Sequence, residues 1–261
     1  MKKKPIPWTT RIAPSQADHY KELGQASPEA WQCRALALYL REMTQAPFYL
    51  EKLNHLPGVW ADFIGRIAGV PVDTDREATV NRLQPAHEAA VSALGFSWSQ
   101  LHRAEQIHSA EIAVIGKDDG ARTWPEVDGL ITAQRGILLG IYVADCGAVY
   151  IVDPVKNIIA LLHSGKKGTE ENITGKAIRI MQEKYGSRPA DLIVALAPCI
   201  RPPAYEVDFA AEIHQQALAA GVPESQFTDC GICTTSDLDK YYSYRVEQGN
   251  TGRMLALLGV R

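Results

Sequence analysis

Two reactive side chains stand at matching points of the sequence, each at the end of an apolar run. Cys146 follows the run that begins at Gly136, and His163 closes the run that begins at Asn157. The two residues are 17 positions apart. In α/β proteins, functional side chains gather where strands end and loops begin, so we expect this thiol and this imidazole to meet.

A second histidine extends the pattern. His108 precedes another short apolar run, 38 residues before Cys146. If the three strand ends converge, one thiolate and two imidazoles form a site with an open fourth position, as in catalytic zinc centres. The same residues also fit a cysteine nucleophile that His163 activates without a metal. A buried cysteine beside two hydrogen-bonded histidines is a third interpretation, and spacing alone leaves all three open.

Cationic residues follow these runs. Lys166 and Lys167 lie between two glycines directly after His163, and lysines with free backbone amides are suited to an anion. Their order is not that of a Walker A loop. Arg245 and Arg253 flank a Gly-Asn turn near the C-terminus and are further candidates to hold an anion.

The alternation of apolar and polar residues predicts an α/β protein. One helix is expected to begin at Ser27 and end before Pro47, and a second covers residues 87–95, after a break at Pro85. Helices are also expected over residues 168–186 and 209–221. Short β-branched runs predict strands at residues 111–116, 128–132, 136–144, 148–153, 157–163 and 191–198. Continuous apolar strands with a helix between them indicate a sheet that is covered on both faces.

The overall composition excludes several classes of protein. The chain has 261 residues, of which 46% are hydrophobic and 22% charged, so it can bury a substantial core. A net charge of −3 argues against a partner that is nucleic acid or an anionic membrane. Five irregularly spaced cysteines favour reduced thiols over a disulfide framework. With neither a signal peptide nor a membrane-spanning run, we expect a cytoplasmic protein.

Several short motifs occur in a recognisable order. They lie at residues 105–109 (EQIHS), 127–132 (VDGLIT), 143–154 (VADCGAVYIVDP), 161–169 (LLHSGKKGT), 197–207 (APCIRPPAYEV), 241–245 (YYSYR) and 251–254 (TGRM). From about Asp62 to the C-terminus, this order resembles the multicopper polyphenol oxidase (laccase) domain family. Members of that family are better described as metal-dependent purine nucleoside phosphorylases.

The resemblance implies that His108, Cys146 and His163 bind a zinc ion and form the catalytic centre. It further implies phosphorolysis of adenosine, inosine or methylthioadenosine, and adenosine deamination at the same site. The substrates would be a purine nucleoside and phosphate. Zinc deaminases move protons with a carboxylate, for which Asp145 and Glu105 are the candidates here.

The resemblance also implies substrate contacts. Arg66 in the segment FIGRIAGV matches the arginine of a family segment F-x-T-R-x-G-G-V, which makes it a candidate for binding substrate or phosphate. Lys166 and Lys167 are candidates for binding phosphate near the metal. These two lysines replace the tryptophan and arginine of the family pattern H-A-G-W-R-G, and lysine lacks the bidentate geometry of arginine.

We therefore predict a helical N-terminal extension over residues 1–60 and a laccase-domain-like α/β domain over residues 61–261. The domain is expected to be a mixed β-sheet sandwich covered by helices. The predicted function is zinc-dependent purine nucleoside phosphorolysis, with adenosine deamination beside it. The alternatives are a copper-dependent polyphenol oxidase, a cysteine hydrolase that uses Cys146 and His163, and a diverged member that is not an enzyme.

Overall fold

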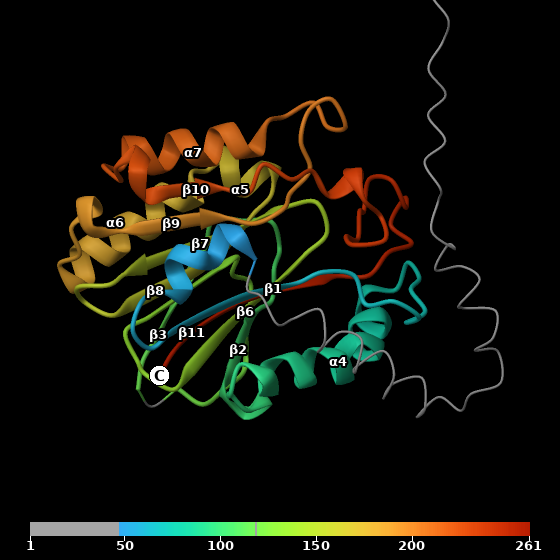
Figure 1. Ribbon diagram of the computed structural model, residues 1–261, viewed down its shortest axis with the longest axis horizontal. Coiled ribbons are helices and arrows are strands. Elements are labelled where there is room, and N and C mark those ends of the chain that lie inside the picture. Colours follow the sequence, from blue (N-terminus) through green and yellow to red (C-terminus); the bar gives the residue numbers. More distant parts are fainter. Residues whose placement is uncertain (1–46, 118) are drawn as a thin grey trace, which may run out of the picture.

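Two β-sheets stack face to face between layers of helices in the computed structural model, which describes residues 47–117 and 119–261 (Figure 1). The first sheet has the strand order β1-β11-β6-β2-β4, and the second has the order β10-β9-β7-β8-β5-β3. Each sheet contains parallel and antiparallel pairs. The predicted mixed sandwich covered by helices is confirmed.

The strands of the two sheets are short, with at most seven residues each. They are β1 (Val59–Ile64), β2 (Leu101–Ala104), β3 (Ile112–Ile115), β4 (Thr123–Trp124), β5 (Gly129–Thr132), β6 (Ile137–Val143), β7 (Gly147–Asp153), β8 (Ile158–Ser164), β9 (Ile193–Leu196), β10 (Phe227–Asp229) and β11 (Met254–Val260). The α-helices are α3 (Glu51–Asn54), α4 (Arg76–Ala93), α5 (Lys166–Glu170), α6 (Ile173–Tyr185) and α7 (Phe209–Ala219). Short 3-10 helices are η1 (Phe48–Leu50), η2 (Trp98–Gln100), η3 (Pro189–Asp191), η4 (Glu224–Gln226) and η5 (Thr234–Ser236).

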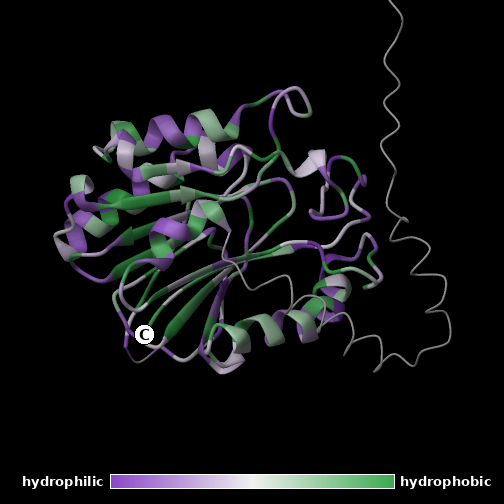
Figure 2. Ribbon diagram, viewed as in Figure 1, coloured by the Kyte–Doolittle hydropathy of each residue, from purple (hydrophilic) through white to green (hydrophobic). Residues whose placement is uncertain are grey.

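Alternate residues of the central strands supply two separate cores. Along β8, Ile159 and Leu161 belong to the core between the two sheets, whereas Ala160 and Leu162 belong to the core under α6 and α7. This follows from the two-residue period of a strand. Helix α4 covers the outer face of the first sheet (Figure 1). The strands are accordingly the most hydrophobic ribbons of the molecule (Figure 2).

The chain crosses between the two sheets repeatedly, and these crossings determine where the functional side chains lie. The β2–β3 loop and the tight β6–β7 connection both lead from the first sheet to the second. The long segment from β10 to β11 returns to the first sheet. His108 lies on the first of these connections and Cys146 on the second.

Two helix predictions need correction. The helix predicted to begin after Pro85 is the second half of α4, which starts at Arg76 and contains Pro85. The Asp75 carboxylate caps its first turn by accepting a hydrogen bond from the backbone of Ala78 at 3.0 Å, and burial of residues such as Leu83 offsets the hydrogen bond that a proline removes. The predicted helix stop at Gly95 is confirmed, since this residue follows the helix with φ +76°.

The helix predicted over residues 168–186 is divided into α5 and α6. Asn172 breaks it because its backbone is left-handed, with φ +58°. Its side chain then caps α6, accepting a hydrogen bond from the Gly175 N–H at 2.9 Å. Asparagine is among the residues that adopt this conformation at little cost.

The described residues before position 60 pack into the main core. Tyr49, Leu50 and Leu53 are buried there, and β1 begins at Val59 and pairs with β11. The helix predicted to begin at Ser27 lies outside the described residues, and the domain boundary near residue 60 stays a prediction. Among the described helices, none combines the length and the apolar character needed to cross a bilayer.

Asp62 gives the fold a testable pH dependence. Its side chain is 5% exposed, and one carboxylate oxygen is buried without a hydrogen-bond partner. Burial raises the pKa of Asp62 to about 6. The folded protein therefore binds this proton more tightly than the unfolded chain, so the free energy of unfolding falls as pH rises from about 4 to 6.

We expect Asp62→Asn to stabilise the protein above pH 6, because it removes the buried charge, by up to about 3 kcal/mol. Below pH 4 the variant and the parent should be nearly equal. Urea unfolding at pH 4 and pH 7.5 measures this, with the exposed Asp239→Asn as the matched control. Equal stabilisation at both pH values would contradict the prediction.

Candidate active site

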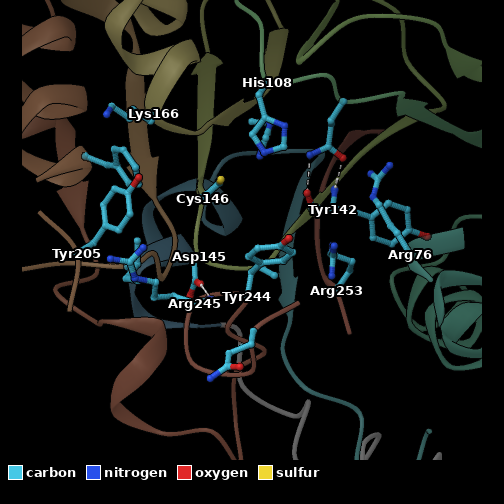
Figure 3. A pocket seen from close by; sticks show the side chains of 16 residues that line it. Arg76, His108, Tyr142, Asp145, Cys146, Lys166, Tyr205, Tyr244, Arg245 and Arg253 are labelled. Carbon is cyan, nitrogen blue, oxygen red and sulfur yellow. Dashed lines mark hydrogen bonds between the residues drawn. The ribbon is translucent and has the colours of Figure 1, made fainter. Parts of the chain in front are cut away.

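His108, Cys146 and His163 converge at one point of the fold, as the sequence predicts. One ligand atom from each side chain lies within 4.8 Å of the other two. The two imidazole rings meet edge to face, with centroids 4.9 Å apart. Figure 3 shows the Cys146 sulfur below and to the left of the His108 ring.

Strand β8 positions His163. The side chain is 3% exposed and continues the row of Ile159 and Leu161 at the end of the inter-sheet core. Its Nδ1 lies 2.7 Å from an oxygen of the Asp128 carboxylate. This contact orients the ring and leaves Nε2 to face the thiol.

Asp128 also positions His108. Its fully buried carboxylate accepts hydrogen bonds from the backbone N–H groups of Ile107 (3.2 Å), His108 (3.0 Å) and Ser109 (2.6 Å), and from the Ser109 hydroxyl (2.8 Å). These bonds hold His108 in a left-handed conformation, with φ +60°. One carboxylate thus fixes both histidines.

Gln106 attaches the same loop to the first sheet. Its side-chain amide donates to the backbone oxygen of Tyr142 at 2.5 Å and accepts from the Tyr142 N–H at 3.1 Å. Tyr142 lies in β6, the strand that leads to Cys146. The loop that carries His108 is therefore tied to the strand that positions the thiol.

Asp145 shapes the connection that presents Cys146. Its backbone has φ +83°. Its carboxylate accepts hydrogen bonds from the hydroxyls of Thr234 (2.6 Å) and Ser243 (3.1 Å) and from the backbone N–H of Arg245 (2.7 Å). Asp145 thus binds the segment between β10 and β11 to the site, and its acceptor atoms are already engaged.

The electrostatics of the group favour a thiolate. Burial by itself raises the pKa of Cys146, but the neighbouring His163 and His108 lower it to about 6. Burial lowers the pKa of His163, and the Cys146 thiolate and Asp128 raise it to about 9. Hydrogen bonds from His163 and Ser109 outweigh the burial of Asp128, so the pKa of its carboxyl lies below the usual value.

The three side chains fit a metal ion. A side-chain carbon on Gly165 would lie 2.9 Å from the Cys146 sulfur and 3.2 Å from Cδ2 of His108, so only glycine leaves these side chains room. One thiolate and two imidazoles suit zinc and also copper. The carboxylate–histidine contact through Asp128 is the usual support of a metal-binding histidine.

A cavity of about 710 Å³ opens over this group. Its size falls in the range of sites for small organic ligands, about 300–1,000 Å³. Four aromatic side chains line it, and Figure 3 labels three of them. They are Tyr142, Tyr205, Phe209 and Tyr244.

Four cationic side chains also line the cavity: Arg76, Lys166, Arg245 and Arg253. Asp145 is the only carboxylate among the described lining residues. Arg253 donates to the backbone oxygens of Thr251 and Gly252, and burial together with the nearby Arg76 lowers its pKa. Within residues 47–117 and 119–261, neither Arg76 nor Arg253 forms an ion pair.

The predicted substrate contacts divide into two groups. Lys166 lines the cavity, whereas Lys167 is outside the lining and lies 3.6 Å from Glu171. Arg66 is also outside the lining, with its guanidinium 2.7 Å from Glu247 and over the ring of Tyr242. The structure therefore does not bring Lys167 or Arg66 to the cavity.

Arg66 instead stabilises the segment that follows β10 through its ion pair with Glu247. Its partner Glu247 also accepts hydrogen bonds from the Ser243 N–H (3.0 Å) and the Thr251 hydroxyl (2.5 Å). Although burial opposes it, Arg66 and these donors keep the pKa of Glu247 below its usual value. Glu247 thereby closes the loop that presents Arg245 and Arg253 to the cavity.

Sequence reasoning missed several residues of the site. Asp128 is part of the VDGLIT motif, but nothing in the sequence showed that its carboxylate faces two histidines. Tyr205 lies in the PPAYEV motif, but the motif did not indicate that its side chain lines the cavity. Arg76 had no signal because α4 was predicted to start eleven residues later. Glu105, a candidate proton shuttle, is exposed and lies outside the cavity lining.

Comparisons with known proteins agree with this geometry. A family model described as multi-copper polyphenol oxidoreductase laccase matches residues 69–218 and 207–261. The chain is similar to a protein of Geobacillus stearothermophilus named purine nucleoside phosphorylase YlmD, with 32% identity over 230 residues, covering 74% of this chain and 82% of that protein. It is also similar to a protein of Deinococcus radiodurans named purine nucleoside phosphorylase, with 30% identity, covering 75% of this chain and 84% of that protein.

Solved structures give the same result. The crystal structure of YlmD from Geobacillus stearothermophilus superimposes with a TM-score of 0.71 and 27% identity, covering 79% of this chain and 93% of that chain. A Bacillus licheniformis protein, YfiH, has a TM-score of 0.71 at 21% identity, covering 78% of this chain and 93% of that chain. The second likeness concerns the fold alone.

The Asp128 contacts predict a loss of metal affinity. Asp128→Asn removes the charge that orients His163, and we expect about 10- to 100-fold weaker metal binding. Competition with a chromogenic chelator measures the affinity. Ser109→Ala, which removes one donor and keeps the carboxylate, is the control and should have a smaller effect. Unchanged affinity in a folded Asp128→Asn protein would contradict the assignment.

Arg66 should act through Glu247 rather than on a ligand. We expect Arg66→Met and Glu247→Gln each to reduce kcat/KM by about tenfold, or about 1.4 kcal/mol, by loosening the same loop. The double variant should then lose no more than the stronger single variant. Losses that multiply in the double variant would show instead that Arg66 contacts the substrate.

Proposed function

The chain belongs to the multi-copper polyphenol oxidoreductase laccase family, and from this premise we propose that it is a metal-dependent purine nucleoside phosphorylase. Relatives named purine nucleoside phosphorylase support the proposal. The observation that carries it is the meeting of His108, Cys146 and His163 at a cavity with aromatic walls and unpaired guanidinium groups. The substrates would be a purine nucleoside and orthophosphate.

We propose that His108, Cys146 and His163 hold a zinc ion. With one thiolate ligand, a zinc ion held by these residues would keep a net charge of about +1 and would supply Lewis acidity toward a bound oxygen ligand. Copper is the alternative metal, because the same donors accept it. Asp128 keeps both histidines in the orientation that this binding requires.

Arg253 and Arg76 are suited to bind the phosphate. Burial and, after it, the nearby positive charge of Arg76 lower the pKa of Arg253, so an anion between the two guanidinium groups would be stabilised. Arginine binds phosphate oxygens in a bidentate manner. The backbone bonds of Arg253 to its own loop keep its guanidinium in place.

The aromatic walls are suited to bind the purine. Tyr205 and Phe209 lie with ring centroids 5.1 Å apart, and Tyr244 is half-exposed at the cavity. Flat aromatic side chains bind a base by stacking. In phosphorolysis, phosphate then attacks C1′ of the ribose while the purine leaves.

Adenosine deamination is the weaker proposal for this cavity. Zinc deaminases need a free carboxylate to move protons. Asp145 already accepts three hydrogen bonds, and the described lining contains no other carboxylate. Phosphorolysis makes no such demand, and we therefore propose it first. A cysteine hydrolase would use Cys146 and His163 without the metal.

The decisive experiment measures base release with and without phosphate, together with the metal content. We expect free purine from inosine or adenosine only when orthophosphate is present, and one metal ion per chain. Cys146→Ala should lose the metal and reduce turnover by about 100-fold or more. Cys230→Ala removes another buried thiol and is the matched control.

Other outcomes point elsewhere. Ammonia release from adenosine would report deamination, and phenol oxidation restored by copper alone would favour the oxidase. Full activity in metal-free protein would contradict the metal centre. No base release from any nucleoside by the metal-loaded protein would contradict the proposed function.

A further inference from the structure

The cationic side chains of the cavity form two groups on different sides of Cys146. In Figure 3, Arg76 and Arg253 lie on the Tyr142 side of Cys146, whereas Lys166 and Arg245 lie on the opposite side, where Tyr205 also lines the cavity. We call these the Arg76–Arg253 group and the Lys166–Arg245 group. Tyr244 lies between Arg245 and Arg253 in the same view.

The charge of the cavity exceeds what orthophosphate can neutralise. Four cations and one carboxylate give the described lining a formal charge of +3, before the metal and its thiolate are added. A phosphate group at neutral pH carries about −1.5 to −2. Phosphate at the Arg76–Arg253 group would therefore leave the charge of the Lys166–Arg245 group largely uncompensated, because its described ion-pair partner is the exposed Glu206 beside Arg245.

The position of Arg245 is fixed by the fold. Its backbone N–H donates to the buried carboxylate of Asp145 at 2.7 Å. Its guanidinium lies over the Tyr205 ring, 5.2 Å from the centroid. Its ion-pair partner is Glu206 at 3.5 Å, but both side chains are about 60% exposed, so solvent weakens this pair.

Lys166 is available to a ligand in the same way. It is the first residue of α5 and follows Gly165, which packs against Cys146. It forms no ion pair with any residue of 47–117 or 119–261, whereas the neighbouring Lys167 is paired with Glu171. The loop thus directs one lysine to the cavity and the other to its own helix.

We propose that the preferred substrate carries a phosphate of its own, as a purine nucleoside 5′-monophosphate does, and that the Lys166–Arg245 group binds this 5′-phosphate. The inference rests on the proposed function, since it assigns orthophosphate to the Arg76–Arg253 group. The purine would stack on the aromatic walls between the two groups. Lys166 is then the residue that distinguishes nucleotide from nucleoside.

The reaction balances without any further reactant. An oxygen of hydrogen phosphate forms a bond to C1′, and the bond between C1′ and N9 breaks. The bonding pair leaves with N9, and the purine takes the proton that hydrogen phosphate brought. The products are the free purine and ribose 1,5-bisphosphate.

Equilibrium binding tests the inference independently of turnover. We expect the metal-loaded protein to bind inosine 5′-monophosphate at least tenfold more tightly than inosine, by calorimetry in phosphate-free buffer. Lys166→Met should remove most of this preference. Lys156→Met, which neutralises an exposed lysine of the β7–β8 turn, is the matched control and should keep it. Saturating orthophosphate should leave the nucleotide bound, because the two anions occupy different groups.

Turnover separates this inference from the proposed function. With phosphate present, kcat/KM for the nucleotide should exceed that for inosine, and Lys166→Met should lower the ratio of the two at least tenfold. Inosine bound as tightly as its monophosphate, competition between the nucleotide and orthophosphate, or equal effects of Lys166→Met and Lys156→Met would each overturn the inference. Base release from inosine alone would still support the proposed function. Tight nucleotide binding that depends on Lys166, without base release from any substrate, would support the 5′-phosphate site but contradict the proposed function and, with it, the role of the nucleotide as substrate.

Discussion

The buried carboxylate of Asp128 is the interaction on which the arrangement of the site depends. A charge removed from water is tolerated only where donors surround it, and Asp128 collects backbone donors from residues 107–109, the Ser109 hydroxyl and the ring of His163. The loop from the first sheet and the end of β8 in the second sheet therefore meet at one residue. Both histidines are oriented because the Asp128 carboxylate is hydrogen-bonded to the backbone of His108 and to the ring of His163.

The acidic and the cationic side chains near the cavity differ in their partners. The carboxylates near the cavity are engaged inside the protein: Asp145 holds the segment after β10, and Glu247 closes the following loop with Arg66. Among residues 47–117 and 119–261, Arg76, Lys166 and Arg253 form no ion pair, and the partner of Arg245 is the exposed Glu206. The resulting positive cavity beside Cys146 and the two histidines suits anionic ligands.

The family pattern and this chain differ at a place that the structure makes meaningful. Lysines replace the tryptophan and arginine that follow H-A-G in the family pattern, and the structure brings Lys166 to the cavity and directs Lys167 to Glu171. The ligand group of His108, Cys146 and His163 is retained, whereas the wall of the cavity is altered. Under the proposed function, such a change would leave the three ligand residues in place and alter the surface that contacts the substrate.

The sequence by itself indicated strands β3 and β5 to β9 and the reactive group, but not β1, β2, β4, β10 or β11. The apolar runs before Cys146 and up to His163 are strands whose residues alternate between two cores. Their length and β-branched composition allow them to be predicted from the sequence. The position of His108 before another apolar run added it to the group, and the family resemblance implied its role as a ligand. The sequence pattern predicted the wrong start for α4. The helix continues through Pro85 because Asp75 caps its first turn and its buried side chains pack against the rest of the protein, and local helix propensity does not include this packing.

Only the tertiary structure decided which charged residues face the ligand. Arg66 and Arg253 are both arginines in recognisable segments, but one is neutralised by Glu247 and the other is directed at the cavity. Asp128 became the support of the site only when the β2–β3 loop and β8 were brought together. The reason is physical: a charged side chain acquires its role from its partners, and these partners lie up to 181 residues apart in the sequence.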